Sequence, residues 1–291
     1  MAAQGGAGAV KQAKNSLGIM RGVKFLLALF LAALIFIGYR KYHTWDIDGL
    51  MGFYEVWGNF PDQRERQFMR LVIEGDVDAV LAEAKTVPGG VNATGTEGLT
   101  PLMIAVRHLD MPMVKALLKA GAKPDGAKWW VPLASAVRAY DLDYARTLLA
   151  AGANPDGLSS ARLPLAEAAM IDYRDGVDLL LKSGAHVDAK DDGGETAVIT
   201  TAASGQIDMV NYLLDRGASI WTATRLGHTV ANLGGETCMH LAINDPKVHA
   251  DCQRLLDRLH AAHYPWPPPK AAEMERLVKE GKWPPKEAQG H

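Results

Sequence analysis

Four similar segments follow one another in the middle of the chain, and each ends with the pair Gly-Ala. The glycines of these pairs are Gly121, Gly152, Gly184 and Gly217, which lie 31, 32 and 33 residues apart. A period near 33 residues is typical of folds in which small units are stacked, because a single unit cannot bury its own apolar face. The repeat therefore predicts a solenoid with a continuous core.

Each unit has the pattern of two short helices joined by a turn. A proline stands in the first turn of the expected first helix at Pro101, Pro132 and Pro164, where its missing N–H group costs no hydrogen bond. A second helix follows, and the glycine of each Gly-Ala pair suits a left-handed C-cap. The position four residues into each first helix is small, which lets neighbouring helices approach closely; it holds Ala105, Ala136, Ala168 and Thr201. We therefore expect an all-α fold of helix-turn-helix units with short hairpin connections.

These units resemble the ankyrin repeat. The best match runs from Asp192 to Thr196 and continues with Gly205, Val210, Leu213, Leu214, Gly217 and Ala218. Weaker matches at 68–91 and 235–242 extend the resemblance over about 62–261, so we expect six units, with the terminal two as caps. The resemblance implies a domain that binds another protein with its hairpin tips and inner helices, without a catalytic residue or a cofactor.

The chain departs from the family pattern at the histidine that follows Pro-Leu. The four central units have Met103, Ala134, Ala166 and Ile199 at this position. The later segment Gly235 to Ala242 keeps a histidine, His240, and we expect the pattern to restart there after a longer connection. Apolar packing should therefore hold most of the solenoid together.

The N-terminal region predicts a membrane anchor. Residues 1–24 contain four basic residues and no acidic one, and the apolar run FLLALFLAALIFIGY follows at 25–39. This run is shorter than the ~20 residues of a typical span, but the stems of flanking Lys24, Arg40 and Lys41 can lengthen it. We expect an uncleaved signal anchor, with a cleaved secretory signal as the alternative.

The charge distribution around the apolar run predicts its orientation. The excess of positive charge before it favours a cytoplasmic tail at 1–24 and an exported domain, with the opposite topology as the alternative. Aromatic residues in 40–61 indicate a membrane-proximal stalk, and 262–291 form a proline-rich connector followed by a helix that should fold back on the last repeat. The composition, rich in Ala and Gly, is typical of bacteria. We therefore expect a single-pass protein of the bacterial inner membrane with its C-terminal domain in the periplasm.

Composition and motifs exclude several functions. The net charge of −2, from 31 basic and 33 acidic residues, argues against nucleic acid as a partner. The sequence has no nucleophile elbow, no zinc-protease motif and no phosphate-binding loop, so we expect no enzyme, no small-molecule substrate and no metal. The recurring Asp125, Asp156 and Asp188 are interpreted as turn-stabilising residues. Cys238 and Cys252 permit one disulfide, but we expect two free, half-buried thiols.

The register of the repeat gives the candidate partner-binding residues. They are Glu97, Arg107, His108, Lys128, Trp130, Arg138, Ser160, Arg162, Met170 and Glu195, and the same register adds Leu99 and Asp192. Because Trp and Arg are enriched at the energetic centres of protein interfaces, we expect the second and third units to contribute most. Trp129 stands where the repeat has a hairpin glycine, so we expect a reshaped hairpin with Trp129 packed on a neighbouring unit and Trp130 as the contact residue.

These patterns favour a membrane-anchored protein-binding module without catalysis. Among small bacterial proteins, the arrangement is similar to immunity proteins that neutralise a secreted antibacterial effector, such as a type VI lipase. An adaptor that holds a periplasmic enzyme or envelope complex at the membrane is the alternative.

Overall fold

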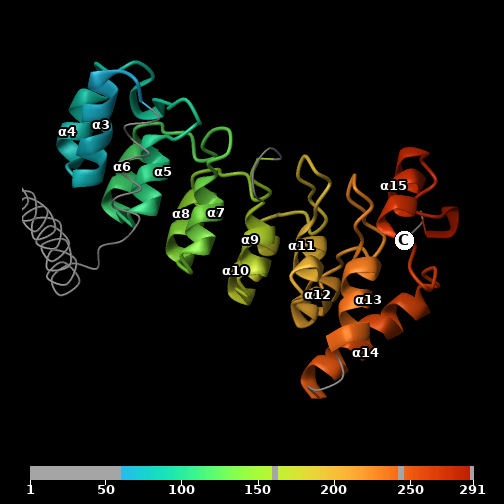
Figure 1. Cartoon of the computed structure of the whole chain (residues 1–291). Coiled ribbons are helices and arrows are strands. Elements are labelled where there is room, and N and C mark those ends of the chain that lie inside the picture. The colour runs from blue at the N-terminus through green and yellow to red at the C-terminus, as the bar shows by residue number, and fades with distance from the viewer. Residues whose placement is uncertain (1–59, 159–162, 242–245, 289–291) are drawn as a thin grey trace, which may run out of the picture. The chain divides into compact units, whose positions relative to one another are not determined.

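The computed structural model describes residues 60–158, 163–241 and 246–288, and the statements below concern this part of the chain. Its helices form consecutive antiparallel pairs (Figure 1). The pairs are α3 (Gln63–Glu74) with α4 (Val77–Glu83), α5 (Pro101–Arg107) with α6 (Met111–Lys119), α7 (Pro132–Arg138) with α8 (Leu142–Ala150), α9 (Pro164–Met170) with α10 (Arg174–Lys182), α11 (Ala197–Ala203) with α12 (Ile207–Leu214), and α13 (Val230–Leu241) with α14 (Pro246–Ala261).

Three further elements complete the described chain: the 3-10 helices η1 (Gly90–Asn92) and η2 (Lys286–Ala288), and α15 (Ala271–Lys279). The described residues contain isolated β-bridges but no strand. The prediction of an all-α repeat fold is therefore confirmed for them. None of their helices has the length and apolar character needed to cross a membrane. The predicted span at 25–39 and nearly all of the stalk at 40–61 lie outside the described residues.

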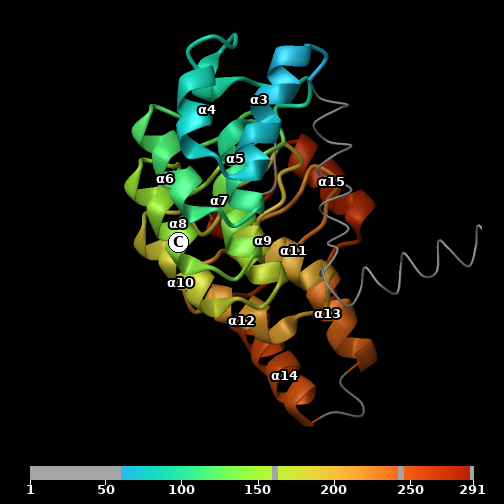
Figure 2. The same cartoon turned by 90° about the vertical axis from the view of Figure 1, so that its left-hand side faces the viewer.

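The paired helices form two layers. Figure 2 shows the first helices α5, α7, α9, α11 and α13 on one side and the second helices α6, α8, α10 and α12 on the other. Each first helix packs on the first helix of the next unit, from α5 to α13. The small residues that were expected to permit this approach are fully buried: Ala105, Ala136, Ala168 and Thr201. The sequence pattern thus predicted the close packing of this layer correctly.

Leucine and valine fill the space between the two layers. Each central unit buries one large aliphatic residue near the start of its first helix and one leucine in its second helix. The first set is Leu102, Leu133, Leu165 and Val198, and the second is Leu117, Leu148, Leu180 and Leu213. Because α5, α7, α9 and α11 pack on one another in turn, the buried residues form a core that continues along the stack.

Polar side chains join consecutive units at the bases of the hairpin loops. Each carboxylate or amide oxygen accepts a hydrogen bond from a backbone N–H group of the next unit. The pairs are Asn92 with Lys123 at 2.7 Å, Asp125 with Asn154 at 2.6 Å, Asp156 with His186 at 2.7 Å, and Asp188 with Ser219 at 3.0 Å. The recurring aspartates therefore belong to the scaffold, as expected, but they stabilise the junction between units more than a turn within one unit.

The last helix pair starts earlier than the sequence pattern predicted. Helix α13 begins at Val230, directly after Thr229, which lies 33 residues after Thr196 and caps its helix in the same way. Asn232 takes the place of the family histidine: its side chain accepts the Thr229 N–H at 2.8 Å and donates to the Gly227 carbonyl oxygen at 2.8 Å. The expected restart at Gly235 with a retained His240 is therefore wrong. Through these two hydrogen bonds, Asn232 ties the preceding loop to the start of α13.

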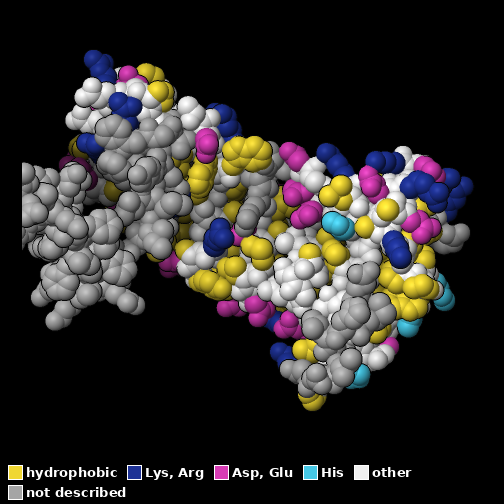
Figure 3. All heavy atoms as spheres, in the orientation of Figure 1, with side chains coloured by type: hydrophobic (Ala, Val, Ile, Leu, Met, Phe, Trp, Pro, Cys, Tyr) yellow, Lys and Arg dark blue, Asp and Glu magenta, His cyan; other side chains and the backbone are white. Residues whose placement is uncertain are grey.

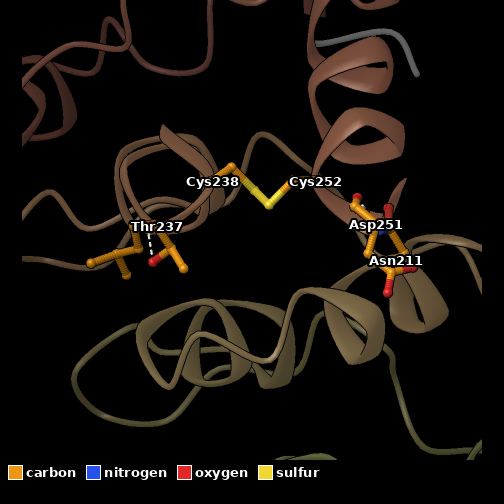
Figure 4. Close-up of a disulfide and its surroundings, with 6 residues drawn as sticks. Asn211, Thr237, Cys238, Asp251 and Cys252 are labelled. Atoms are coloured by element: carbon orange, nitrogen blue, oxygen red, sulfur yellow. Dashed lines mark hydrogen bonds between the residues drawn. A yellow bond between two sulfur atoms is a disulfide. The ribbon is translucent and has the colours of Figure 1, made fainter. Parts of the chain in front are cut away.

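Cys238 on α13 and Cys252 on α14 form a disulfide, so the expectation of two free thiols is wrong (Figure 4). Their Cα atoms lie 5.2 Å apart, and both residues are buried. The physical reason is the antiparallel packing of α13 on α14, which brings two residues 14 positions apart face to face. The bond closes the last helix pair covalently.

The C-terminal segment packs on the loop of the last repeat. Trp283 donates its indole N–H to the Trp221 carbonyl oxygen at 2.9 Å, and both rings contact the buried Tyr264. Burial raises the pKa of the Tyr264 hydroxyl to about 12. A Cβ atom on Gly227 would lie 2.0 Å from the Ala271 carbonyl oxygen, so only glycine permits α15 to sit this close to the loop.

Candidate binding surface on the first helices

The hairpin loops and the exposed ends of α5, α7, α9 and α11 form one side of the described chain, which we call the first-helix face. Figure 3 views the chain from this side and shows hydrophobic, basic and acidic side chains interspersed over it. Among the described residues, no group of three or more His, Cys, Asp or Glu side chains is arranged to hold a metal ion.

The hairpin at 127–130 is the most distinctive feature of this face. Ala127 and Trp130 exchange backbone hydrogen bonds of 3.1 and 3.3 Å, so Lys128 and Trp129 form a two-residue loop between them. The positive φ of 51° falls on Lys128 and not on Trp129. The hairpin is thus reshaped, as expected, because the turn has moved by one residue from the position of the family glycine.

The two tryptophans of this hairpin have the opposite environments to those predicted. Trp129 lies at the tip of the loop with 66% of its surface exposed, whereas Trp130 is half-buried. The guanidinium carbon of Arg107 lies 5.3 Å from the centroid of the Trp130 ring. Trp130 therefore joins the first unit to the second, and Trp129 is the side chain that extends into solvent.

Charged side chains bind neighbouring units together along the same face. The Lys128 ammonium donates to the Thr96 carbonyl oxygen at 2.5 Å and so connects the first two hairpin loops. Arg138 on α7 lies 3.9 Å from the carboxylate of Glu167 on α9, and this glutamate is buried. The arginine side chain stays largely exposed, so it can meet a partner while it offsets the charge of the buried carboxylate.

The remaining predicted residues are spread along the face. Glu97, His108 and Glu195 are exposed, and Met170 is half-buried at the end of α9. Ser160 and Arg162 lie outside the described residues. Leu99, which the repeat register placed on the surface, is fully buried, because the hairpin loop folds it under the start of α5. Sequence reasoning missed Trp129, although its position at a hairpin tip was a signal for exposure.

Comparison with protein families decides the identity of the fold. A family model described as an ankyrin repeat matches residues 97–129, and one described as three copies of ankyrin repeats matches 133–224 and 165–262. These matches cover more than half of the chain. The chain is an ankyrin-repeat protein. Ankyrin repeats are protein-binding modules, so the chain's central domain is one too.

The ankyrin-repeat units also explain why side chains on the first-helix face are available for binding. Its loops and helix ends are held by contacts between units, whereas its outward-pointing side chains contribute little to the core. Residues such as Trp129 are therefore free to differ without loss of the fold. Surfaces of this kind, presented by a rigid scaffold, are suited to recognition of another macromolecule.

Proposed function

We propose that this ankyrin-repeat protein binds a protein partner on the first-helix face while an N-terminal segment anchors it in a membrane. The main support for this binding surface is the arrangement of side chains around the second unit. Trp129 is exposed next to Trp130, which contacts Arg107 of the preceding unit. Arg138, at the other end of α7, lies near Glu167 of the following unit, so contacts between units hold these side chains in place. Aromatic and arginine side chains held in place before binding lose little conformational entropy, which favours affinity.

The disulfide supports a location of the repeat domain outside the cytoplasm. Cys238 and Cys252 are paired, and disulfides persist in oxidising compartments such as the bacterial periplasm but are rare in the cytosol. The apolar run at 25–39, preceded by four basic residues, agrees with an anchor that leaves the repeats on the exported side. These two features come from opposite ends of the chain and favour the same topology.

We further propose that the partner is a secreted antibacterial effector, such as a lipase, and that the chain acts as its immunity protein at the inner membrane. An inhibitor anchored at the membrane would meet an incoming toxin at the surface which that toxin attacks. The alternative partner, a resident envelope enzyme, would make the chain an adaptor.

The proposal is tested by capture of partners with the full-length protein from its own membranes. Wild type is compared with the pair Trp129→Ala and Arg138→Ala on the first-helix face, and with the pair Lys115→Ala and Lys182→Ala on the exposed side of the second helices. One protein should be lost only with the first pair. Equal recovery with both pairs would refute the surface, and a resident envelope protein in place of an effector would refute the immunity role.

Topology is tested separately with alkaline phosphatase fused after residue 291. This enzyme is active only when it is exported, so we expect an active fusion. An inactive phosphatase fusion, together with an active cytoplasmic reporter at the same position, would place the domain in the cytoplasm and contradict the proposed location.

A further inference from the structure

The turns between paired helices lie at the helix ends away from the hairpin loops (Figure 1). In three consecutive units the residue with left-handed backbone in this turn is not glycine: Leu109, Tyr140 and Asp172 have φ of 53°, 57° and 54°. The flanking units have Gly75 and Gly205 at the same position, with φ of 78° and 72°. Glycine adopts this conformation without strain, whereas an L-residue with a side chain does not. Leucine and tyrosine therefore destabilise turns that glycine would form more easily.

The side chains of two of these residues are not buried in the core. Leu109 is 51% exposed and Tyr140 is 57% exposed, so neither is explained by burial. A strained backbone that presents a large apolar side chain to solvent is a combination found at functional surfaces. The fold alone gives no reason for leucine at position 109.

Tyr140 is also held in one orientation. Its hydroxyl donates to the Ile171 carbonyl oxygen at 2.9 Å, and its ring lies 4.9 Å from the ring of Tyr173. The Tyr173 hydroxyl in turn donates to the Tyr140 carbonyl oxygen at 3.1 Å. The exposed face of the Tyr140 ring is thus fixed before any partner arrives, which lowers the entropy lost on binding.

The same turns carry an excess of negative charge. Residues 108–112, 139–143 and 171–175, which we call the turn edge, contain five aspartates and one arginine. Asp110 and Asp141 each accept a backbone N–H group at 2.9 Å to cap α6 and α8. Within the described residues, these two carboxylates and that of Asp175 have no ion-pair partner. Leu109 and Tyr140 are therefore each followed by a carboxylate that forms no ion pair within the described residues.

We infer that the turn edge is a second docking surface, for a protein segment that carries lysine or arginine beside an aliphatic or aromatic side chain. Leu109 and Tyr140 would contact the apolar side chain, and Asp110 and Asp141 would face the cations. A second copy of this chain is disfavoured because two acidic edges repel each other, and anionic lipid is disfavoured for the same reason. The turn edge adjoins the first-helix face at His108 and Arg138, and the variant Leu109→Gly separates the two surfaces because it changes the turn edge alone.

The test uses the full-length chain in its membrane with p-benzoylphenylalanine in place of Ala139, an exposed neighbour that leaves Leu109 and Tyr140 intact. The matched control places the same photoreactive residue at the exposed Lys182 on α10. After irradiation, we expect an adduct at 139 but not at 182, and mass spectrometry should identify the attached peptide as a segment with net positive charge. A lipid adduct, a dimer of this chain, a peptide without net positive charge, or no adduct at 139 would overturn the inference.

Leu109→Gly separates binding from folding. This variant should lower the yield of the adduct at 139 at least fivefold, while the midpoint of thermal unfolding stays the same or rises because the turn is relieved of strain. The control Leu226→Ala, which removes an exposed leucine from a hairpin loop, should leave the yield unchanged. An unchanged yield with Leu109→Gly would contradict the role of the turn edge.

Discussion

The guanidinium carbon of Arg107 lies 5.3 Å from the centre of the Trp130 ring, so side chains of two consecutive units form one contact on the first-helix face. A cation over an indole ring at a partly exposed site stabilises by about 0.5–1 kcal/mol. A double-mutant cycle of Arg107→Ala and Trp130→Ala, followed by urea unfolding, should give a coupling free energy of about this size. The same cycle with Trp129→Ala should give almost none, because Trp129 extends into solvent. Equal coupling energies for the two tryptophans would show that the contact is not specific.

The disulfide between Cys238 and Cys252 should make a large contribution to stability. The cysteines lie 14 positions apart, and closing a loop of this length restricts the unfolded chain by about 3 kcal/mol. Replacing both cysteines with alanine should therefore lower the free energy of unfolding by about that amount, as measured by urea unfolding without reductant. An unchanged free energy would mean that the pair adds no constraint.

The state of the two cysteines in the cell tests export at the same time. The chain has two cysteines in all, so thiol labelling after an acid quench reports on this pair alone. We expect no labelling of the denatured protein until a reductant is added. Labelling of the native protein from cells without reductant would contradict both the bond and the oxidising compartment.

Much of the fold followed from local sequence. The helix pairs were predicted from proline at the first helical turn, a small residue four positions later and leucine at helical spacing. The repeat period then predicted that these pairs stack on one another. The disulfide could not be predicted in this way, because it depends on how α13 packs on α14. The start of α13 was also misplaced: Thr229 is 33 residues after Thr196, but its helix lacks the proline or Thr-Ala signal that marks the earlier units.

His186, at the base of a hairpin loop, should have a higher imidazole pKa than a free histidine. The Asp156 carboxylate lies 2.5 Å from His186 Nδ1, and this hydrogen bond and its charge raise the pKa of the imidazole above its ordinary value. The folded state therefore holds the proton more tightly than the unfolded state does. The stabilising effect is complete below the ordinary pKa of about 6.5 and is lost as pH rises through the folded-state value.

This effect can be measured by NMR titration of the His186 ring. Asp156→Asn is a suitable control, because the amide oxygen can still accept the His186 backbone N–H while the negative charge is removed. We expect a lower imidazole pKa in the variant. If wild type and Asp156→Asn titrate at the same pH, the carboxylate is not what raises the pKa.

Gly227 should be intolerant of any side chain. A Cβ atom there would meet the Ala271 carbonyl oxygen at 2.0 Å, and the φ of 78° adds backbone strain. Gly227→Ala should push α15 off the loop and cost about 2–4 kcal/mol, because it combines overpacking with an unfavourable backbone conformation. Faster proteolysis after residue 262 and a shift in tryptophan fluorescence should report the loss. Gly217→Ala, where no atom lies within 4 Å of the new Cβ, separates the close contact from the strain of the positive φ.

The binding surface was less predictable than the fold. The repeat register predicted Arg107, Trp130 and Arg138 as partner-binding residues, which remains a prediction, and it exchanged the environments of Trp129 and Trp130. Which of two adjacent residues is exposed depends on the hairpin turn, and here the positive φ moved to Lys128. Leu109 and Tyr140 also replace a glycine of the repeat pattern, but the register alone does not show that their side chains are exposed.

Protein binding through the first-helix face is the central proposal for this chain. The measurement that tests it is the Kd of the captured partner for the full-length chain, by biolayer interferometry, with wild type and two matched pairs of variants. Trp129→Ala with Arg138→Ala should weaken binding at least tenfold, which corresponds to about 1.4 kcal/mol, and Lys115→Ala with Lys182→Ala should change it less than twofold. Equal weakening by both pairs, or no weakening by the first, would show that the partner does not bind through the first-helix face.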